Sequence, residues 1–273
     1  MTLRTNVKLN LGLRVLGKRP DGYHELESLF IPYSGFGDEL TIEPADSFGI
    51  EICGPCYRGW DPSEDLTARA WRLLRDEFGV DPVHIFLVKK SPVGAGLGGG
   101  SADGAFALCM MDDIFSLGLS NSELAGLAAR LGSDCPFFIY NRPMFASGRG
   151  EILEPFDIDL SGYRIEVTVP EGVEVSTKEA YAAHPSQPAG WAPPSNSAEG
   201  GMPPGGYPLP LRDALRLPVA DWRGVLVNDF ERSVFPLHPE IPALKKDFYR
   251  RGAVYASMSG SGSAVFALFP ANK

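Results

Sequence analysis

The amino-acid sequence predicts an α+β fold, with strands and helices interleaved along a chain of 273 residues. The first sixty residues alternate apolar and polar positions between turn signals, which is typical of β-strands. Helical patterns begin after them and are separated by further short strand patterns. A chain of this length forms one large domain or two modest ones with a substantial core.

The individual elements follow from periodicity and from capping residues. The helix expected at 66–78 has Ser63 or Asp65 as a cap and Gly79 as its stop, and Ser120 and Glu123 have the spacing of a capping box. The expected strands are 7–13, 26–33, 39–43, 49–53, 83–88, 163–169, 254–258 and 264–269. The expected helices are 66–78, 102–115, 122–131, 228–235 and 241–251.

Composition and charge exclude several classes of protein. The hydrophobic fraction of 44% is ordinary for a globular chain, and no apolar run approaches the roughly 20 residues that span a bilayer. The formal net charge of -9 repels nucleic acid and anionic lipid. The first residues lack a signal-peptide pattern, so we expect a cytoplasmic protein. Residues 185–210 are rich in Pro, Gly, Ser and Ala and are expected to form a flexible insertion.

Cys53 and Cys56 lie in a Cys-Gly-Pro-Cys tetrapeptide, a pattern that suits dithiol redox chemistry. A redox dithiol of this kind sits at the start of a helix, whose positive end lowers the pKa of the first thiol. Residues 55–62 instead have the pattern of a turn. Two reduced cysteines near the end of a strand are therefore the preferred interpretation, and a redox role is kept as a remote alternative.

A glycine-rich segment before the helix at 102–115 is the strongest candidate for binding an anion. Backbone N–H groups of glycines can approach an anion closely, and the positive end of a helix adds to the attraction. A P-loop would need a lysine where Ser101 stands, whereas a dinucleotide-binding pattern and a purely structural turn remain possible from the segment alone. The segment consists of Pro92, Val93, Gly94, Ala95, Gly96, Leu97, Gly98, Gly99, Gly100, Ser101 and Ala102.

Four further motifs are distributed along the chain. They are Lys8-Leu-Asn10-Leu with residues 17–26, residues 131–138 around Asp134, residues 145–151 with 175–181, and the Ser-Gly turn at 259–263. The glycine segment resembles the phosphate loop of the galactokinase, homoserine kinase, mevalonate kinase and phosphomevalonate kinase (GHMP) superfamily. All five motifs together resemble the family of 4-diphosphocytidyl-2-C-methyl-D-erythritol kinases of the non-mevalonate isoprenoid pathway. The resemblance covers nearly the whole chain outside residues 185–210.

The resemblance implies a two-domain GHMP-kinase fold. Residues 1–155 would form an amino-terminal, ATP-binding domain like ribosomal protein S5, and residues 156–273 a ferredoxin-like carboxyl-terminal domain. It also implies an active-site lysine at Lys8, a catalytic base at Asp134, and a phosphate loop at Pro92–Ala102. Orientation of the attacking hydroxyl matters most in phosphoryl transfer, so an aspartate need accept the proton only as the new bond develops.

The substrate implied by the resemblance is a cytidine diphosphate polyol, phosphorylated on its 2-hydroxyl by ATP. Tyr23 and Tyr181 would provide two faces around the cytosine, and the two glycine loops would face each other. The substrate-binding residues so implied are Asn10, Tyr23, His24, Thr177 and Tyr181. Mg²⁺ is expected as the partner of ATP, with Ser101 as a ligand or a water-mediated contact and no dedicated protein cage.

Departures from the family pattern and rival functions complete the prediction. Asp65 stands where an asparagine commonly helps to recognise the nucleotide base, Asn6-Val7 replaces Pro-Ala, and Asn141 replaces a glycine. A kinase for another alcohol, such as mevalonate or homoserine, would keep Lys8, Asp134 and the loop. A non-catalytic nucleotide-binding protein is the rival from another class. We expect a monomer or homodimer.

Overall fold

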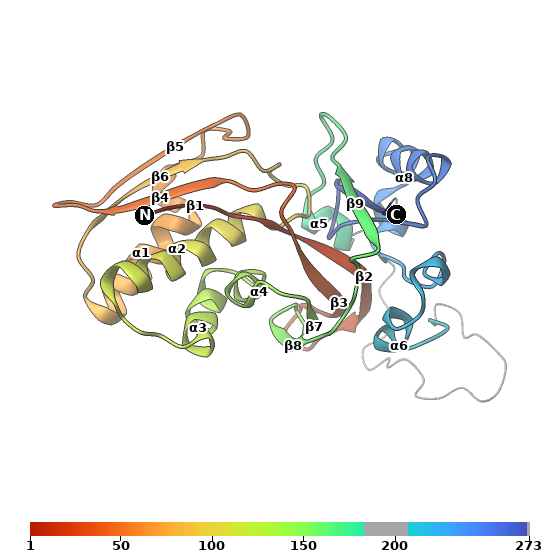
Figure 1. Ribbon diagram of the computed structural model, residues 1–273, viewed down its shortest axis with the longest axis horizontal. Coiled ribbons are helices and arrows are strands. Elements are labelled where there is room, and N and C mark those ends of the chain that lie inside the picture. The colour runs from red at the N-terminus through yellow and green to blue at the C-terminus, as the bar shows by residue number, and fades with distance from the viewer. Residues whose placement is uncertain (183–206, 272–273) are drawn as a thin grey trace. The chain divides into compact units, whose positions relative to one another are not determined.

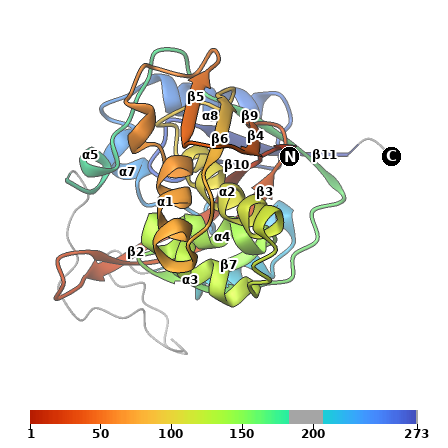
Figure 2. The ribbon, with the colours of Figure 1, turned by 90° about the vertical axis from the view of Figure 1, so that its left-hand side faces the viewer.

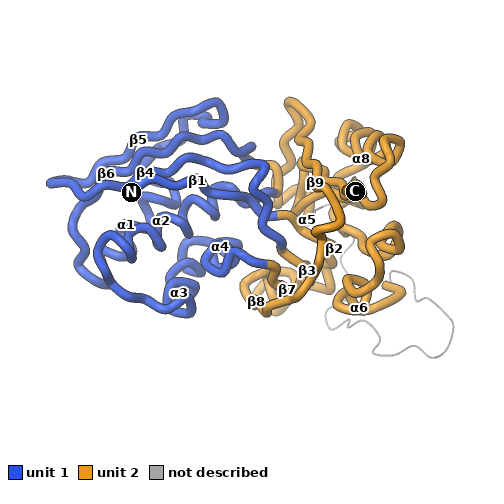
Figure 3. The backbone as a smooth tube through the Cα atoms, viewed as in Figure 1, with its two compact units in different colours: residues 1–8, 31–93, 97–142 blue, residues 9–30, 94–96, 143–273 orange. Residues whose placement is uncertain are grey.

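A computed structural model of the chain describes residues 1–182 and 207–271, which divide into two compact units (Figure 3). Unit 1 comprises residues 1–8, 31–93 and 97–142, and unit 2 comprises residues 9–30, 94–96 and 143–273. The expected domains, 1–155 and 156–273, divide the chain differently and stay a prediction. Most of the expected insertion, residues 185–206, lies outside the described residues.

Unit 1 is a four-stranded sheet with helices on one side. The strand order is β1 (Thr2–Arg4), β4 (Glu39–Pro44), β6 (Val83–Val88) and β5 (Gly49–Cys53), and only β5 and β6 are parallel. Helices α1 (Leu66–Phe78), α2 (Gly99–Phe115), α3 (Asn121–Leu131) and α4 (Cys135–Tyr140) lie on the same side of this sheet (Figures 1 and 2). A single 3-10 turn, η1 (Pro62–Glu64), precedes α1.

Strand alternation and helix caps explain the elements of unit 1. Leu40 and Ile42 of β4 are fully buried, whereas Phe86 of β6 lies on the opposite face with 36% exposure, as the period of two requires. The capping box at Ser120 is formed, and helix α1 ends at Gly79 in a left-handed conformation. Both predictions are confirmed. Helix α2 begins at Gly99, three residues before the expected start at residue 102.

Unit 2 contains most of one sheet and all of another. The first sheet has the order β2 (Val7–Lys18), β3 (His24–Tyr33), β7 (Met144–Gly148) and β8 (Ile152–Pro155), and β2 passes from unit 1 into unit 2 after Lys8. The second sheet is antiparallel, with the order β10 (Tyr255–Met258), β11 (Val265–Pro270) and β9 (Tyr163–Thr168). The sequence patterns did not predict β7 and β8.

The helices of unit 2 complete a second hydrophobic core. They are α5 (Thr177–Ala182), α6 (Leu211–Leu215), α7 (Glu231–Val234) and α8 (Glu240–Arg250), with the 3-10 turn η2 (Val219–Asp221). Helix α8 packs on β10 and β11, and its Ile241 and Phe248 are fully buried in a cluster with Phe230 and Met258. None of the helices in residues 1–182 and 207–271 combines the length and apolarity that a membrane span needs.

Candidate active site

Lys8 and Asp134 meet in unit 1 although 126 positions separate them in the sequence. The Lys8 ammonium nitrogen lies 3.5 Å from Asp134 Oδ2, and Lys8 is 4% exposed, whereas the Asp134 side chain is 31% exposed. Asp134 immediately precedes α4, but its side chain makes no capping hydrogen bond to that helix. The carboxylate therefore faces an ammonium group and is partly open to solvent.

The predicted phosphate loop brings the beginning of α2 next to Lys8. The Lys8 backbone N–H donates to Leu97 O at 2.9 Å, and a Cβ atom on Gly98 would lie 3.2 Å from Lys8 Cγ. Gly98 has a φ of 72° and directly precedes α2, whose first turn contains no acidic residue. The first N–H groups of a helix have no acceptor within the helix, so the start of α2 offers donors and a positive dipole to an anion.

Ser101 lies in this first turn of α2, and its hydroxyl forms a hydrogen bond with the Cys135 thiol. Burial raises the pKa of Cys135 to about 12, so this thiol is not a nucleophile at neutral pH. Within residues 1–182 and 207–271, no group of three His, Cys, Asp or Glu side chains is placed to hold a metal ion.

The beginning of the glycine loop and the carboxyl-terminal turn 259–263 lie in contact within unit 2, as expected. A Cβ atom on Gly96 would lie 2.2 Å from Ser259 O, and Ser259 Oγ donates to Gly96 O at 3.3 Å. Ala264 N donates to Ala95 O at 3.1 Å. The two backbones therefore touch directly, and only a glycine fits at position 96.

Two buried asparagines hold the 259–263 turn. Asn10 is 1% exposed; its Nδ2 donates to Ser28 Oγ at 2.9 Å and its backbone N donates to Ser259 Oγ at 3.3 Å. Asn228, which the sequence patterns did not single out, donates from Nδ2 to Met258 O and Gly260 O at 2.8 Å each. Asn10 thus orders the turn, and its predicted contact with substrate stays a prediction. Asn228 could not be singled out from the sequence, because it is a lone asparagine beside a helix pattern.

The aromatic residues predicted to bind substrate have neighbours of their own in the structure. Tyr181 stacks on His24 with ring centroids 4.6 Å apart and planes at 19°, and its edge meets Phe230 at 4.8 Å. Tyr23 is 56% exposed, and the Arg149 guanidinium lies 4.8 Å from its ring centroid. The structure therefore brings His24 and Tyr181 together, and the cytosine site between Tyr23 and Tyr181 stays a prediction.

Thr177 and the remaining loop residues occupy two kinds of position. Thr177 Oγ1 lies 3.2 Å from Ser261 Oγ, which joins the start of α5 to the carboxyl-terminal turn. Ala95, Leu97 and Ala102 are buried, so their side chains pack inside the protein and only their backbone can reach a ligand. Pro92, Val93, Gly94 and Gly100 are partly or fully exposed.

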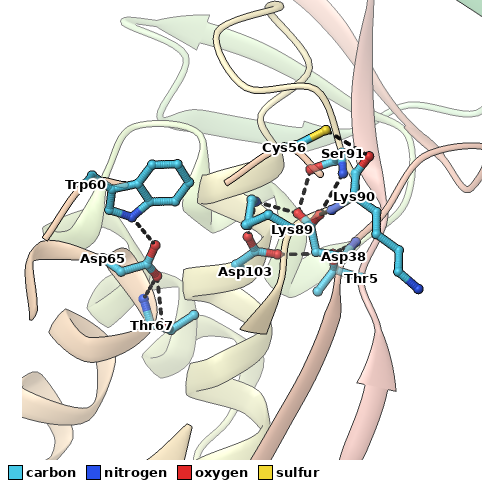
Figure 4. A network of polar contacts seen from close by, with 10 residues as sticks. All are labelled: Thr5, Asp38, Cys56, Trp60, Asp65, Thr67, Lys89, Lys90, Ser91 and Asp103. Atoms are coloured by element: carbon cyan, nitrogen blue, oxygen red, sulfur yellow. Dashed lines mark hydrogen bonds and ion pairs between the residues drawn. The ribbon is translucent and has the colours of Figure 1, made fainter. Parts of the chain in front are cut away.

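Asp65 acts as a helix cap in this structure (Figure 4). Its Oδ1 accepts from Thr67 N at 2.9 Å and from Thr67 Oγ1 at 2.7 Å, and its Oδ2 accepts from Trp60 Nε1 at 3.2 Å. A carboxylate can only accept hydrogen bonds, and both oxygens already do so here. Asp65 therefore fixes the start of α1 and the indole of Trp60.

The Cys-Gly-Pro-Cys segment is a turn after β5, as the sequence predicted. All four cysteines are free, and Cys53 is the last residue of β5. Cys56 Sγ lies 3.4 Å from Lys90 O. Because neither thiol lies at a helix start, the feature that activates redox dithiols is missing from this segment.

Comparison with known proteins identifies two family regions. Residues 65–142 match the GHMP kinases N terminal domain, and residues 211–273 match the GHMP kinases C terminal region. The chain is 43% identical to the 4-diphosphocytidyl-2-C-methyl-D-erythritol kinase of Bacteroides thetaiotaomicron, with 97% of this chain and 90% of that protein covered.

Solved structures agree with this result. The crystal structure of a 4-(cytidine 5'-diphospho)-2C-methyl-D-erythritol kinase matches with a TM-score of 0.76 and 34% identity, covering 98% of this chain and 90% of that one. The homoserine kinase of Cytophaga hutchinsonii matches with a TM-score of 0.63 at 18% identity, covering 99% of this chain and 86% of that one, and shares the fold. These matches confirm the α+β GHMP-kinase fold that the sequence resemblance implied.

Proposed function

We propose, because the chain belongs to the family of 4-diphosphocytidyl-2-C-methyl-D-erythritol kinases among the GHMP kinases, that it phosphorylates the 2-hydroxyl of this cytidyl alcohol with ATP. The products are the 2-phosphate and ADP, in non-mevalonate isoprenoid precursor biosynthesis. One observation carries the proposal: a family relative is 43% identical over 97% of the chain. The Lys8–Asp134 pair beside the start of α2 gives that likeness a chemical basis.

The proposed reaction is a direct phosphoryl transfer. The acceptor oxygen bonds to the γ-phosphorus of ATP while the bond from that phosphorus to the β–γ bridging oxygen breaks, and ADP leaves with the bonding electrons. Asp134 accepts the hydroxyl proton as the new bond forms. Lys8, 3.5 Å from Asp134 Oδ2, orients the carboxylate and the acceptor oxygen. Residues 92–102 form the loop around the phosphates of ATP, and the phosphates accept from backbone N–H groups of its glycines and of the first turn of α2.

Mg²⁺ fits the oxygen chemistry of this site. The hydroxyl of Ser101 and the ATP phosphates would hold it, and the ion would neutralise phosphate charge. The family assignment supports ATP as the donor. The monomeric or homodimeric state and the cytoplasmic location stay predictions.

Cytidine recognition is assigned to unit 2. Tyr23 offers an exposed ring with Arg149 on one face, and His24 and Tyr181 form a stacked pair. We assign Tyr23 to stacking on cytosine, with His24, Tyr181, Thr177 and Asn10 as the other substrate-binding residues. A kinase for mevalonate or homoserine has no base to stack and no need of these aromatic side chains.

An ADP-release assay tests the assignment. The purified protein is supplied with Mg-ATP and either the cytidyl alcohol, mevalonate or homoserine. We expect turnover with the cytidyl alcohol and background release with the other two. Turnover of mevalonate or homoserine in place of the cytidyl alcohol would overturn the substrate and keep the kinase class.

A further inference from the structure

Unit 1 buries three charged side chains that the proposed chemistry does not use (Figure 4). Asp38 precedes β4, Lys89 follows β6, and Asp103 is the fifth residue of α2, with exposures of 0%, 2% and 1%. Burying a charge costs several kcal/mol unless it is paired and hydrogen-bonded. A cluster that serves stability alone would be replaced by apolar side chains at little cost, so these three charges call for an explanation.

Lys89 joins the two carboxylates. Its Nζ lies 2.5 Å from Asp38 Oδ2 and 2.5 Å from Asp103 Oδ2. Asp38 also accepts from Lys90 N at 2.6 Å, from Ser91 N at 2.7 Å and from Ser91 Oγ at 2.5 Å. Burial opposes ionisation of Asp38, but its ammonium partner and these hydrogen bonds outweigh burial and lower its pKa. Asp38 and Lys89 therefore form the permanent ion pair of the cluster.

Asp103 is the third member and the link to the helix. Its Oδ1 accepts from Thr5 Oγ1 at 3.1 Å, and Thr5 Oγ1 accepts in turn from Asp38 N at 2.9 Å. Burial raises the pKa of Asp103 well above its usual value; Lys89 opposes this shift, and the neighbouring Asp38 carboxylate adds to it. Asp103 therefore contributes hydrogen bonds more than charge.

The cluster holds both ends of the phosphate loop and the strand that carries Lys8. Asp38 fixes Ser91 at the beginning of the loop, and Asp103 fixes α2 at its end. A Cβ atom on Gly99 would lie 2.5 Å from Ser91 Oγ, so the first residue of α2 packs directly on this network. Thr5 lies three positions before Lys8, whose backbone N–H is bonded to Leu97 O.

We propose that Asp38, Lys89 and Asp103 are positioning residues of the kinase, which hold the first turn of α2 and Lys8 at the spacing that the ATP phosphates require. This proposal rests on the proposed function. The positioning role goes beyond the proposed function, because it makes ATP affinity depend on side chains that do not themselves contact ATP.

Two substitutions of Asp103 separate positioning from folding. Asp103→Ala cuts the link to α2 but leaves the balanced Asp38–Lys89 pair, so the protein is expected to fold. Asp103→Asn keeps a carbonyl oxygen for Lys89, and its amide keeps a hydrogen bond with Thr5 in the reverse direction, because the Thr5 hydroxyl oxygen has a second lone pair besides the one that accepts from Asp38 N. Lys90→Gln is the matched control, because it removes the neighbouring lysine from an exposed pair with Glu39.

The readouts are the Kd for ATP, measured by calorimetry without acceptor, the KM of each substrate, and the melting temperature. Asp103→Ala is expected to raise Kd and KM for ATP about 10-fold, because displacement of a binding loop by a fraction of an ångström weakens every phosphate contact. The KM of Asp103→Ala for the cytidyl alcohol is expected to stay within about 2-fold of the wild-type value. Asp103→Asn and Lys90→Gln are expected to stay near wild type in all three readouts.

Unchanged ATP affinity in folded Asp103→Ala would overturn the proposal, even if the melting temperature fell. If Asp103→Ala does not fold, Thr5→Val and Thr5→Ser provide the test. Thr5→Val, which loses the hydroxyl, is expected to weaken ATP binding, whereas Thr5→Ser, which keeps it, is not. Equal ATP affinity of the two variants would overturn the proposal. Because ATP binding is measured without acceptor, a failed cytidyl-alcohol assay refutes the proposed substrate and leaves this result standing.

Discussion

Replacing Gly96 by alanine tests the direct backbone contact at the glycine loop. Gly96 has a φ of 74°, where an L-residue loses about 1–2 kcal/mol. The new Cβ would lie 2.2 Å from Ser259 O and 3.0 Å from Gly262 O, and relieving such a contact by backbone movement costs about 1–3 kcal/mol. We expect a total loss of about 2–5 kcal/mol in the apparent free energy of unfolding.

Gly94 is the matched control. Its φ is 72°, nearly the same, but a Cβ atom there would have nothing within 4 Å. Gly94→Ala should therefore show only the conformational loss of about 1–2 kcal/mol. Chemical unfolding followed by circular dichroism, together with ADP release, measures both variants. Equal destabilisation by the two substitutions would refute the contact between the loop and the 259–263 turn.

Asp134→Asn is expected to lower kcat about 100-fold or more and to leave the Kd for ATP within about 3-fold, as measured by ADP release and calorimetry, because only the proton acceptor is lost. Undiminished turnover would remove Asp134 from its role. Asp38→Asn should lower the free energy of unfolding at pH 7 by about 3–5 kcal/mol, because it breaks a buried ion pair. Burial opposes ionisation of Asp38, but its partners outweigh burial and lower its pKa in the folded protein below 3.8, the ordinary value. The stabilisation by ionised Asp38 is therefore complete above about pH 4, and it is lost as the pH falls through the pKa of the folded protein. Unfolding curves of both proteins from pH 7 down should converge only in strong acid, and a constant difference would contradict the assignment. A thiol reagent at pH 8 should modify exposed Cys53 quickly and Cys109 and Cys135 slowly, because burial raises the pKa of the latter two to about 11 and about 12. Four fast thiols in the native protein would contradict this, and Cys53→Ser should turn over like wild type.

Short sequence patterns correctly predicted the helices and strands whose ends are set by neighbouring residues. Helix α1 occupies residues 66–78 as expected, because the Asp65 cap and the left-handed Gly79 are both readable from neighbouring residues. The strand at 83–88 and the hairpin around the 259–263 turn also follow from short patterns. Strand β7, Met144–Gly148, was missed because its sequence was interpreted as a family motif and its burial depends on β3.

The start of α2 and the buried charged cluster depend on tertiary packing, which short sequence patterns do not reveal. Glycine disfavours helix by about 1 kcal/mol relative to alanine, so propensity placed the start of α2 after Gly100, whereas packing against Ser91 requires a glycine at position 99. The buried cluster of Asp38, Lys89 and Asp103 could not be predicted, because charged residues scattered along a sequence normally indicate solvent exposure.

The candidate site was predictable only through resemblance to a family. Nothing in the local patterns joins Lys8 to Asp134, yet the structure places their charged atoms 3.5 Å apart. The stacking of Tyr181 on His24 was not predicted by the motif. Side-chain pairing depends on the backbone around each ring, which a motif does not specify.

The division of the chain between the two units has a consequence for protein synthesis. Every residue of unit 1 has been made once the ribosome passes residue 142, but residues 9–30 of unit 2 are made early and their partners late. Two partners of strand β2 are synthesised much later: Asn228, which forms a β-bridge with Leu13, and Asp229, which accepts a hydrogen bond from Val15 N. At about 5–20 residues per second this delay lasts roughly 10–40 s. During that time Leu13 and Val15 of the finished strand lack core partners such as Phe230, and exposed apolar surface of this kind is prone to aggregation.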